Sequence, residues 1–166
     1  MVWSRHCWLL ISPSNVDLDD PYANEPERPP VFQVNSQKPF NAEPPLSLLI
    51  DKQDTPNDIF FVRNHLPVPV VDPREYVLEV TGEGTDKTLH ISLDDLKTRF
   101  PKQTLRAVIQ CAGNRRSELT CVKPLKGLGW GDGAISNAEW GGVYLRDIFK
   151  QAGLYPVSAS ALYFHV

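Results

Sequence analysis

The alternation of apolar and polar residues predicts strands in the middle of the chain. Residues 75–82, EYVLEVTG, alternate in this way and end at a glycine, and residues 88–92, TLHIS, form a short returning strand. Residues 104–110, TLRAVIQ, predict a buried strand, and residues 59–65, IFFVRNH, predict another that is rich in β-branched and aromatic side chains. The apolar face of the first strand, which predicts that it is half buried, consists of Tyr76, Leu78 and Val80.

Two further segments show helical patterns. Ser92 is expected to cap a helix over residues 93–100, with Asp95 in the capping-box position. A second helix, over residues 143–152, is amphipathic and ends before Gly153, a residue type common just after a helix. Its apolar positions are Leu145, Ile148, Phe149 and Ala152.

Proline is concentrated near the start of the chain, where seven of the 15 prolines fall between Pro21 and Pro45. Because proline fixes φ and lacks an N–H donor, we predict that this stretch forms neither a helix nor a central strand. Its apolar residues would be unusual in a solvated linker, so we expect an extended segment that docks its aromatic side chains on a domain surface. These residues are Tyr22, Val31, Phe32, Val34 and Phe40.

Composition and charge exclude two classes of protein. The 166 residues are 42% hydrophobic and 22% charged, as in an ordinary globular domain. The net charge of −3 and the lack of a dense basic face argue against a nucleic-acid partner. No stretch approaches the roughly 20 apolar residues of a membrane span. Residues 1–12 match neither a secretory signal nor a transit peptide, so the compartment stays open.

The cysteines do not form a zinc motif, but one of them stands beside two arginines. Cys7, Cys111 and Cys121 include no closely spaced pair, and the four histidines are scattered. In QCAGNRRSE, Cys111 ends a predicted strand and is followed by small residues, Arg115 and Arg116. Cationic neighbours favour the thiolate, which suits a soft or high-valent transition metal. These residues alone leave two hypotheses for Cys111, a buried structural thiol and a functional thiolate.

Two other stretches offer groups for a polar ligand. Arg63 lies inside an otherwise apolar pattern, where a charge is costly unless it is paired or faces a pocket, and a guanidinium fork matches an oxyanion. The alternative for Arg63 is an ordinary arginine on the rim of a strand.

Residues 122–142 contain six glycines, but their spacing is not a dinucleotide fingerprint. This loop, with Trp130, either closes over a pocket or lies on the surface with its aromatic residues packed inward.

Four stretches together resemble the molybdopterin domain of the sulfite oxidase and assimilatory nitrate reductase family. They are SQKPFNAEPP, FFVRNHLPVP, CAGNRRSE and VKPLKGLGWGDGAISNAEWGGVYLRDIF, in the family's order and approximate spacing. The resemblance runs from about Asp19 to Gly153. The residues after His65 and the KPFNAEPP stretch are more similar to animal sulfite oxidases, and nitrate reduction is kept as an alternative.

The resemblance implies a molybdenum–molybdopterin cofactor with Cys111 as the protein ligand of the metal. It implies that Arg63 and Arg116 are catalytic and face a sulfite or sulfate pocket near Trp130. The implied reaction is the two-electron oxidation of sulfite to sulfate, with electrons passed to a haem domain and then to cytochrome c in the mitochondrial intermembrane space. The residues implied to line the pterin site are Phe61, Val62, Arg63, Asn64 and His65.

We expect an α+β fold with mixed sheets, short helices and long ordered loops. The predicted parts are a divergent tail over residues 1–18, a proline-rich extended segment over 19–57, and the first part of a molybdopterin-binding domain over 58–166. Residues 161–166 predict another strand, after which the chain stops. The family's haem and dimerisation domains have no counterpart, so we expect a fragment with weak cofactor retention and little turnover. The alternative from another class is a non-catalytic product that binds a partner or misfolds.

Overall fold

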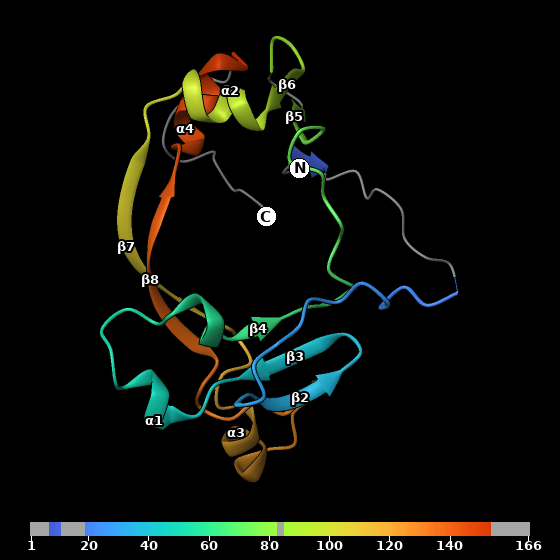
Figure 1. Ribbon diagram of the computed structural model, residues 1–166, viewed down its shortest axis with the longest axis vertical. Coiled ribbons are helices and arrows are strands. Elements are labelled where there is room, and N and C mark those ends of the chain that lie inside the picture. Colours follow the sequence, from blue (N-terminus) through green and yellow to red (C-terminus); the bar gives the residue numbers. More distant parts are fainter. Residues whose placement is uncertain (1–6, 11–18, 83–84, 154–166) are drawn as a thin grey trace, which may run out of the picture. The chain divides into compact units, whose positions relative to one another are not determined.

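The computed structural model describes residues 7–10, 19–82 and 85–153, with only the backbone for residues 7–10 (Figure 1). Most of the predicted tail and the strand expected at residues 161–166 lie outside this part of the chain. The chain divides into two compact units. The first contains residues 1–14, 71–104 and 141–166, and the second contains residues 15–70 and 105–140.

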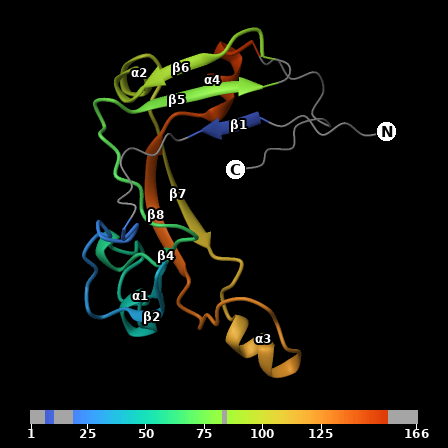
Figure 2. The same ribbon diagram turned by 90° about the vertical axis from the view of Figure 1, so that its right-hand side faces the viewer.

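The first unit is an antiparallel sheet with two helices packed against it. The strand order is β1-β5-β6, and Figure 2 shows these strands side by side. Leu78 and Val80 are buried with Ile148 and Phe149 in one apolar cluster, which confirms the predicted buried face of the strand. The elements are β1 (Cys7–Leu10), β5 (Val77–Gly82), β6 (Leu89–Ser92), α2 (Leu93–Thr98) and α4 (Leu145–Gln151).

The predicted capping box at the start of α2 is confirmed. The Ser92 hydroxyl oxygen accepts a hydrogen bond from the Asp95 backbone N–H at 3.1 Å, and the Ser92 N–H donates to Asp95 Oδ2 at 3.0 Å. The Ser92 hydroxyl also donates to Asp95 Oδ2 at 2.8 Å. The hydrogen bonds from the Ser92 hydroxyl and N–H to this carboxylate, with a smaller contribution from Arg99, hold the pKa of Asp95 below its ordinary value. The helix expected over residues 143–152 is also present, and Gly153 follows it with φ of +84°.

The second unit contains a small antiparallel sheet of order β2-β3-β4 (Figure 1). The prediction that the proline-rich stretch forms no central strand was wrong, because β3 is the middle strand of this sheet. Pro39 and Pro44 flank β3 instead of interrupting it, so its N–H donors stay available. The elements are β2 (Gln33–Gln37), β3 (Phe40–Glu43), β4 (Val62–Arg63), α1 (Leu46–Leu49), a 3₁₀ turn at Asn57–Ile59 and α3 (Arg116–Val122).

The strand expected over residues 59–65 is reduced to the two residues of β4. The chain before it forms the 3₁₀ turn, in which the Ile59 N–H donates to the Pro56 carbonyl at 3.1 Å. The Phe61 N–H donates to the Ser136 hydroxyl oxygen at 3.3 Å, so it does not join the ladder. The β-propensity of these side chains therefore indicated a longer strand than the hydrogen bonds allow.

Strands β7 (Gln103–Gln110) and β8 (Ile135–Gly142) form a separate two-stranded sheet. The expectation that residues 104–110 are buried was wrong, since Leu105, Val108 and Ile109 are each about half exposed. Among the described residues, the three buried apolar clusters contain no side chain of β7, so its apolar residues lack a covering layer there. Small sheets with few short helices confirm the α+β class.

Candidate anion and metal site

The predicted site residues point to a cavity in the second unit. Its volume is about 400 Å³, within the usual range for a small-molecule site. Its described lining includes two arginines and no carboxylate, so it favours an anion. The lining residues are Ser36, Pro39, Asn41, Arg63, Asn64, His65, Arg116, Gly127 and Leu128.

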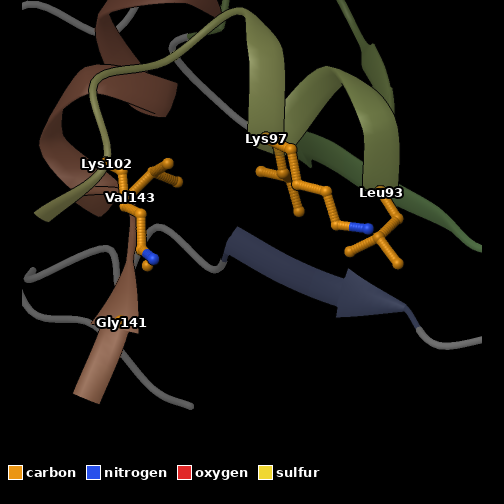
Figure 3. A pocket seen from close by; sticks show the side chains of 7 residues that line it. Leu93, Lys97, Lys102, Gly141 and Val143 are labelled. Carbon is orange, nitrogen blue, oxygen red and sulfur yellow. The ribbon is translucent and has the colours of Figure 1, made fainter. Parts of the chain in front are cut away.

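A larger cavity of about 510 Å³ in the first unit has a different character. Figure 3 shows Leu93 and Lys97 extending from α2, with Lys102 and Val143 on neighbouring segments. Its lining is mainly apolar or glycine, and its charged groups lie on lysines that also reach solvent. None of the predicted site residues lines it.

Asn41 on β3 holds the backbone at one side of the anion cavity. Its Oδ1 accepts hydrogen bonds from the Asn64 N–H at 2.9 Å and from Arg63 Nη1 at 3.3 Å. Its Nδ2 donates to the Asn64 carbonyl at 3.0 Å. The Arg63 guanidinium also donates to His65 Nε2 at 2.8 Å, so that ring nitrogen carries no proton in this contact. One buried amide thus fixes Arg63 and Asn64, and Arg63 in turn contacts His65.

Asn64 presents an unsatisfied donor at this cavity. Its Nδ2 atom is buried and has no hydrogen-bond partner in the described part of the chain. Buried amide donors are normally satisfied, so an unpaired one beside a cavity fits a site built for a polar ligand. An oxyanion or a pterin ring edge supplies the acceptors that this donor lacks.

Two glycines make room for the Arg116 guanidinium on the other side of the cavity. A Cβ added at Gly113 would lie 3.0 Å from both terminal nitrogens of Arg116, and one added at Gly127 would lie 3.1 Å from Nη1. Gly127 also has φ of +111°, a conformation that side chains disfavour. Arg116 Nη1 donates to the Leu128 carbonyl at 2.7 Å. The guanidinium is therefore held in a glycine cradle, and its other donors can bind a ligand wherever the described residues leave them without an acceptor.

Cys111 lies next to this cradle. Its Sγ accepts a hydrogen bond from the Gly113 N–H at 3.3 Å. Because a Cβ added at the same residue would lie 3.0 Å from the terminal nitrogens of Arg116, the sulfur and the guanidinium both lie near Gly113. The Cys111 N–H donates to the Ala134 carbonyl at 2.9 Å, which fixes the start of the loop. The side chain is partly buried and packs against the cluster formed by Phe61, Trp130 and Ala134. An N–H donor and a nearby cation complement the negative charge of a metal-ligating sulfur.

The neighbouring arginine points elsewhere. Arg115 has φ of +63°, uncommon for a residue other than glycine, and it ends the turn that precedes α3. Its Nε donates to a carboxylate oxygen of Glu118 at 3.0 Å, and both side chains are largely exposed. These hydrogen bonds hold the pKa of Glu118 below its ordinary value. The guanidinium groups of the adjacent Arg115 and Arg116 therefore have different partners, Glu118 and Leu128.

The structure brings most of the predicted site residues together, in two adjoining groups. Arg63, Asn64, His65 and Arg116 line the cavity. Cys111, Phe61 and Trp130 belong to the apolar cluster beside the cradle, where Trp130 Cδ1 lies 2.7 Å from a Cβ added at Gly113. Val62 packs instead with Phe32 and Ala42 in another cluster, and its role as a cofactor contact stays a prediction.

Sequence reasoning missed the residues that hold the site in place. Asn41 and Glu43 are each only 2% exposed, and both anchor loops that are distant in sequence. Their spacing of two residues in FNAE, with a small apolar residue between them, places both on one face of a strand. That pattern was available in the sequence, but the flanking prolines had argued against a strand there. No pattern in the sequence distinguishes Gly113 and Gly127 from ordinary loop glycines.

Within the described residues, no helix has the length and apolar character needed to cross a membrane.

Comparison with known proteins assigns the chain to a family. It belongs to the oxidoreductase molybdopterin binding domain family, whose model matches residues 65–166. It is 56% identical to the sulfite oxidase of Gallus gallus over 142 residues, which cover 86% of this chain and 31% of that protein. It is 54% identical to mitochondrial sulfite oxidase of Mus musculus over 143 residues, covering 86% of this chain and 26% of that protein.

A more distant relative is the NADH nitrate reductase 1 of Phaseolus vulgaris, 39% identical over 134 residues, which are 80% of this chain and 15% of that protein. The predicted family is thereby confirmed, and sulfite oxidases match at higher identity than this nitrate reductase. The chain spans less than a third of the length of the two sulfite oxidases.

Proposed function

We propose that this chain provides the metal-ligating cysteine and the oxyanion pocket of a sulfite oxidase-type molybdenum oxidoreductase. One observation supports this more than any other: the Gly113 N–H donates to the Cys111 sulfur, and a Cβ added at Gly113 would lie 3.0 Å from the terminal nitrogens of Arg116, which lines the same cavity as Arg63. A soft ligand and a cationic pocket for a small oxyanion lie next to each other. This is the pairing that sulfite oxidation at a metal requires.

In this proposal the two arginines bind sulfite and release sulfate. Their forked donors match oxygens of a small oxyanion, and they stay charged at every physiological pH. Asn41 and His65 orient the Arg63 guanidinium, and Leu128 orients that of Arg116. Because donors held in place need little reorganisation as charge develops, they stabilise the transition state.

The cofactor fits the donor set of the site. We assign Cys111 as the protein ligand of molybdenum, and the unpaired Asn64 Nδ2 with Arg63 and His65 as polar contacts of the pterin. When bound, the molybdenum cofactor supplies the two-electron redox chemistry. The buried ring of Trp130 limits water on the apolar side of Cys111.

Electron transfer and location extend the proposal to the whole enzyme. We infer that electrons pass from the site to a haem group and then to an acceptor of the cytochrome c type. We infer a mitochondrial location, in the intermembrane space, since the mouse relative is named mitochondrial sulfite oxidase.

The test is sulfite oxidation by the holoenzyme, with cytochrome c reduction as the readout. Cys111→Ser is expected to abolish turnover, because a hydroxyl is a poor substitute for a soft thiolate ligand. Cys121→Ser is the matched control, since Cys121 lies exposed on α3. Unchanged activity in Cys111→Ser would remove this cysteine from the metal. Nitrate reduction at a rate above sulfite oxidation would instead favour the nitrate reductase alternative.

A second candidate is a non-catalytic role in binding a partner. The observation that favours it is the exposed apolar surface of β7 and α3, where Val108 is 56% and Val122 is 89% exposed. Size-exclusion chromatography of the purified 166-residue chain separates the candidates. A monomer with a sharp unfolding transition argues against obligate association, and large assemblies at micromolar concentration support it.

A further inference from the structure

Glu43 is a buried carboxylate that none of the proposed chemistry uses. It ends β3 and is only 2% exposed. Its Oε1 accepts hydrogen bonds from the Gly131 N–H at 2.7 Å and from Asn35 Nδ2 at 3.0 Å, and its Oε2 accepts one from the Gly133 N–H at 2.9 Å. A buried charge persists only when such donors surround it, so this arrangement is specific.

The loop that Glu43 binds also binds the backbone on both sides of Arg116. The Arg115 N–H donates to the Gly131 carbonyl at 2.6 Å, and the Ser117 N–H donates to the Trp130 carbonyl at 3.1 Å. The Trp130 carbonyl and the Gly131 N–H belong to one peptide group. A hydrogen-bonded chain therefore runs from Ser117 through this peptide group to the Glu43 carboxylate.

The hydrogen bonds from Ser117 to the Glu43 carboxylate reinforce one another. An ionised acceptor strengthens the hydrogen bond from the Gly131 N–H, and this polarises the Trp130 carbonyl at the other end of the same peptide group. The glycines permit the close approach, since a Cβ added at Gly133 would lie 2.6 Å from the Pro44 carbonyl oxygen. Asn41, two residues before Glu43, fixes the Arg63 side of the cavity in a similar way.

We propose that Glu43 is a positioning residue of the anion site. Its carboxylate fixes the Trp130–Gly133 loop, and through that loop it holds the backbone of Arg115 and Ser117 so that the Arg116 guanidinium stays in its cradle. The strand β3 thus positions both arginines, through Asn41 on one side and Glu43 on the other. This inference rests on the proposed role of Arg116 as an anion-binding group.

The test compares Glu43→Gln with Thr55→Val in the full 166-residue chain. Glutamine keeps the size but offers one acceptor oxygen, so a loop N–H loses its partner. Thr55 is a buried anchor of similar kind, whose Oγ1 accepts from the Asn137 N–H at 3.2 Å, but its partner lies in strand β8 and not in the Trp130–Gly133 loop. Each variant is measured for its free energy of unfolding and for its dissociation constant with sulfate. We expect Glu43→Gln to weaken sulfate binding about tenfold and Thr55→Val to leave it unchanged.

A spectroscopic readout separates positioning from a general loss of stability. In Glu43→Gln the amide proton resonance of Ser117 should shift, although Ser117 does not touch residue 43, because the shared peptide group is less polarised. Thr55→Val should leave that resonance in place. Wild-type sulfate affinity together with an unmoved Ser117 amide in Glu43→Gln would overturn the proposal.

Two further measurements make the result decisive. If Glu43→Gln does not fold, hydrogen exchange in the native chain decides: strong protection of the Gly131, Gly133 and Ser117 amides supports the proposal, and rapid exchange at all three overturns it. A sulfate titration of Arg116→Gln distinguishes a failure of the Glu43 inference from a failure of the proposed function. Wild-type sulfate binding in Arg116→Gln contradicts the proposed anion site, whereas weak binding there beside wild-type binding in Glu43→Gln contradicts only the role of Glu43.

Discussion

Arg116 donates a hydrogen bond from Nη1 to the carbonyl oxygen of Leu128 at 2.7 Å. This contact holds the guanidinium over Gly113 and Gly127, where any larger residue would crowd it. Arg115, one residue earlier, pairs with Glu118 on the exposed surface instead. Two adjacent residues of the same type therefore make different contacts, and the first of them, Arg115, has a left-handed backbone.

The first prediction concerns the guanidinium fork of Arg116. Arg116→Lys keeps the charge but loses the planar set of donors, so sulfate binding should weaken about tenfold. Arg115→Lys is the matched control and should change the dissociation constant less than twofold, roughly the effect of a surface ion pair. Isothermal titration with sulfate measures both. Equal effects of the two substitutions would contradict the assignment of Arg116 to the anion.

The second prediction concerns the glycine cradle. In Gly113→Ala the added methyl group would meet Trp130 Cδ1 at 2.7 Å and both terminal nitrogens of Arg116 at 3.0 Å. We expect the free energy of unfolding to fall by about 1–3 kcal/mol and sulfate binding to weaken. Gly142→Ala is the control, since a Cβ there has no neighbour within 4 Å. Urea titration of both variants gives the comparison, and similar stabilities would mean that the cradle is not tight.

The third prediction concerns Asn41. Asn41→Ala removes the acceptor for the partly buried Asn64 N–H and one of the two donors to the Asn64 carbonyl, which keeps its hydrogen bond from Arg63 Nη1. The free energy of unfolding should fall by about 2 kcal/mol, and amides of residues 62–65 should exchange faster. Denaturant titration and hydrogen exchange measure the two effects. Unchanged exchange in this segment would show that Asn41 does not hold the Arg63 side of the site.

The fourth prediction concerns pH and the capping box of α2. The pKa of Asp95 is lowered from its ordinary value of 3.8 in the folded chain, chiefly by the Ser92 hydroxyl. The ionised Asp95 therefore stabilises the fold above the unfolded-state pKa, and this contribution is lost as the pH falls through the lower folded-state pKa. Asp95→Asn should be less stable than the native chain near pH 6, and the difference should shrink toward about pH 2. A difference that stays constant would contradict the lowered pKa.

Much of the local structure could be predicted from sequence. The Ser92 capping box, the strand with Leu78 and Val80 buried, and the helix that ends before Gly153 depend on neighbours within a few residues. Such patterns are present in the sequence because they follow the period of one element. The family was predicted differently, from the resemblance of four stretches in order, and the family model confirms it.

Other features depend on residues far apart in the chain. The strand expected over residues 59–65 is shortened because the Phe61 N–H is bound by Ser136, 75 residues later. Glu43 acts on the Gly131 loop, 88 residues later, and no local pattern indicates that pairing. The burial expected for residues 104–110 depended on a covering layer that the described part of the chain does not provide for Val108.

The most direct test of the central claim is the number of sulfur ligands around molybdenum, measured by X-ray absorption spectroscopy of the holoenzyme. If Cys111 binds the metal, Cys111→Ser should show one sulfur ligand fewer than the native protein, because a thiolate has been replaced by a weaker oxygen donor. Cys121→Ser should match the native protein, since Cys121 lies exposed on α3. An unchanged number of sulfur ligands in Cys111→Ser would contradict the account.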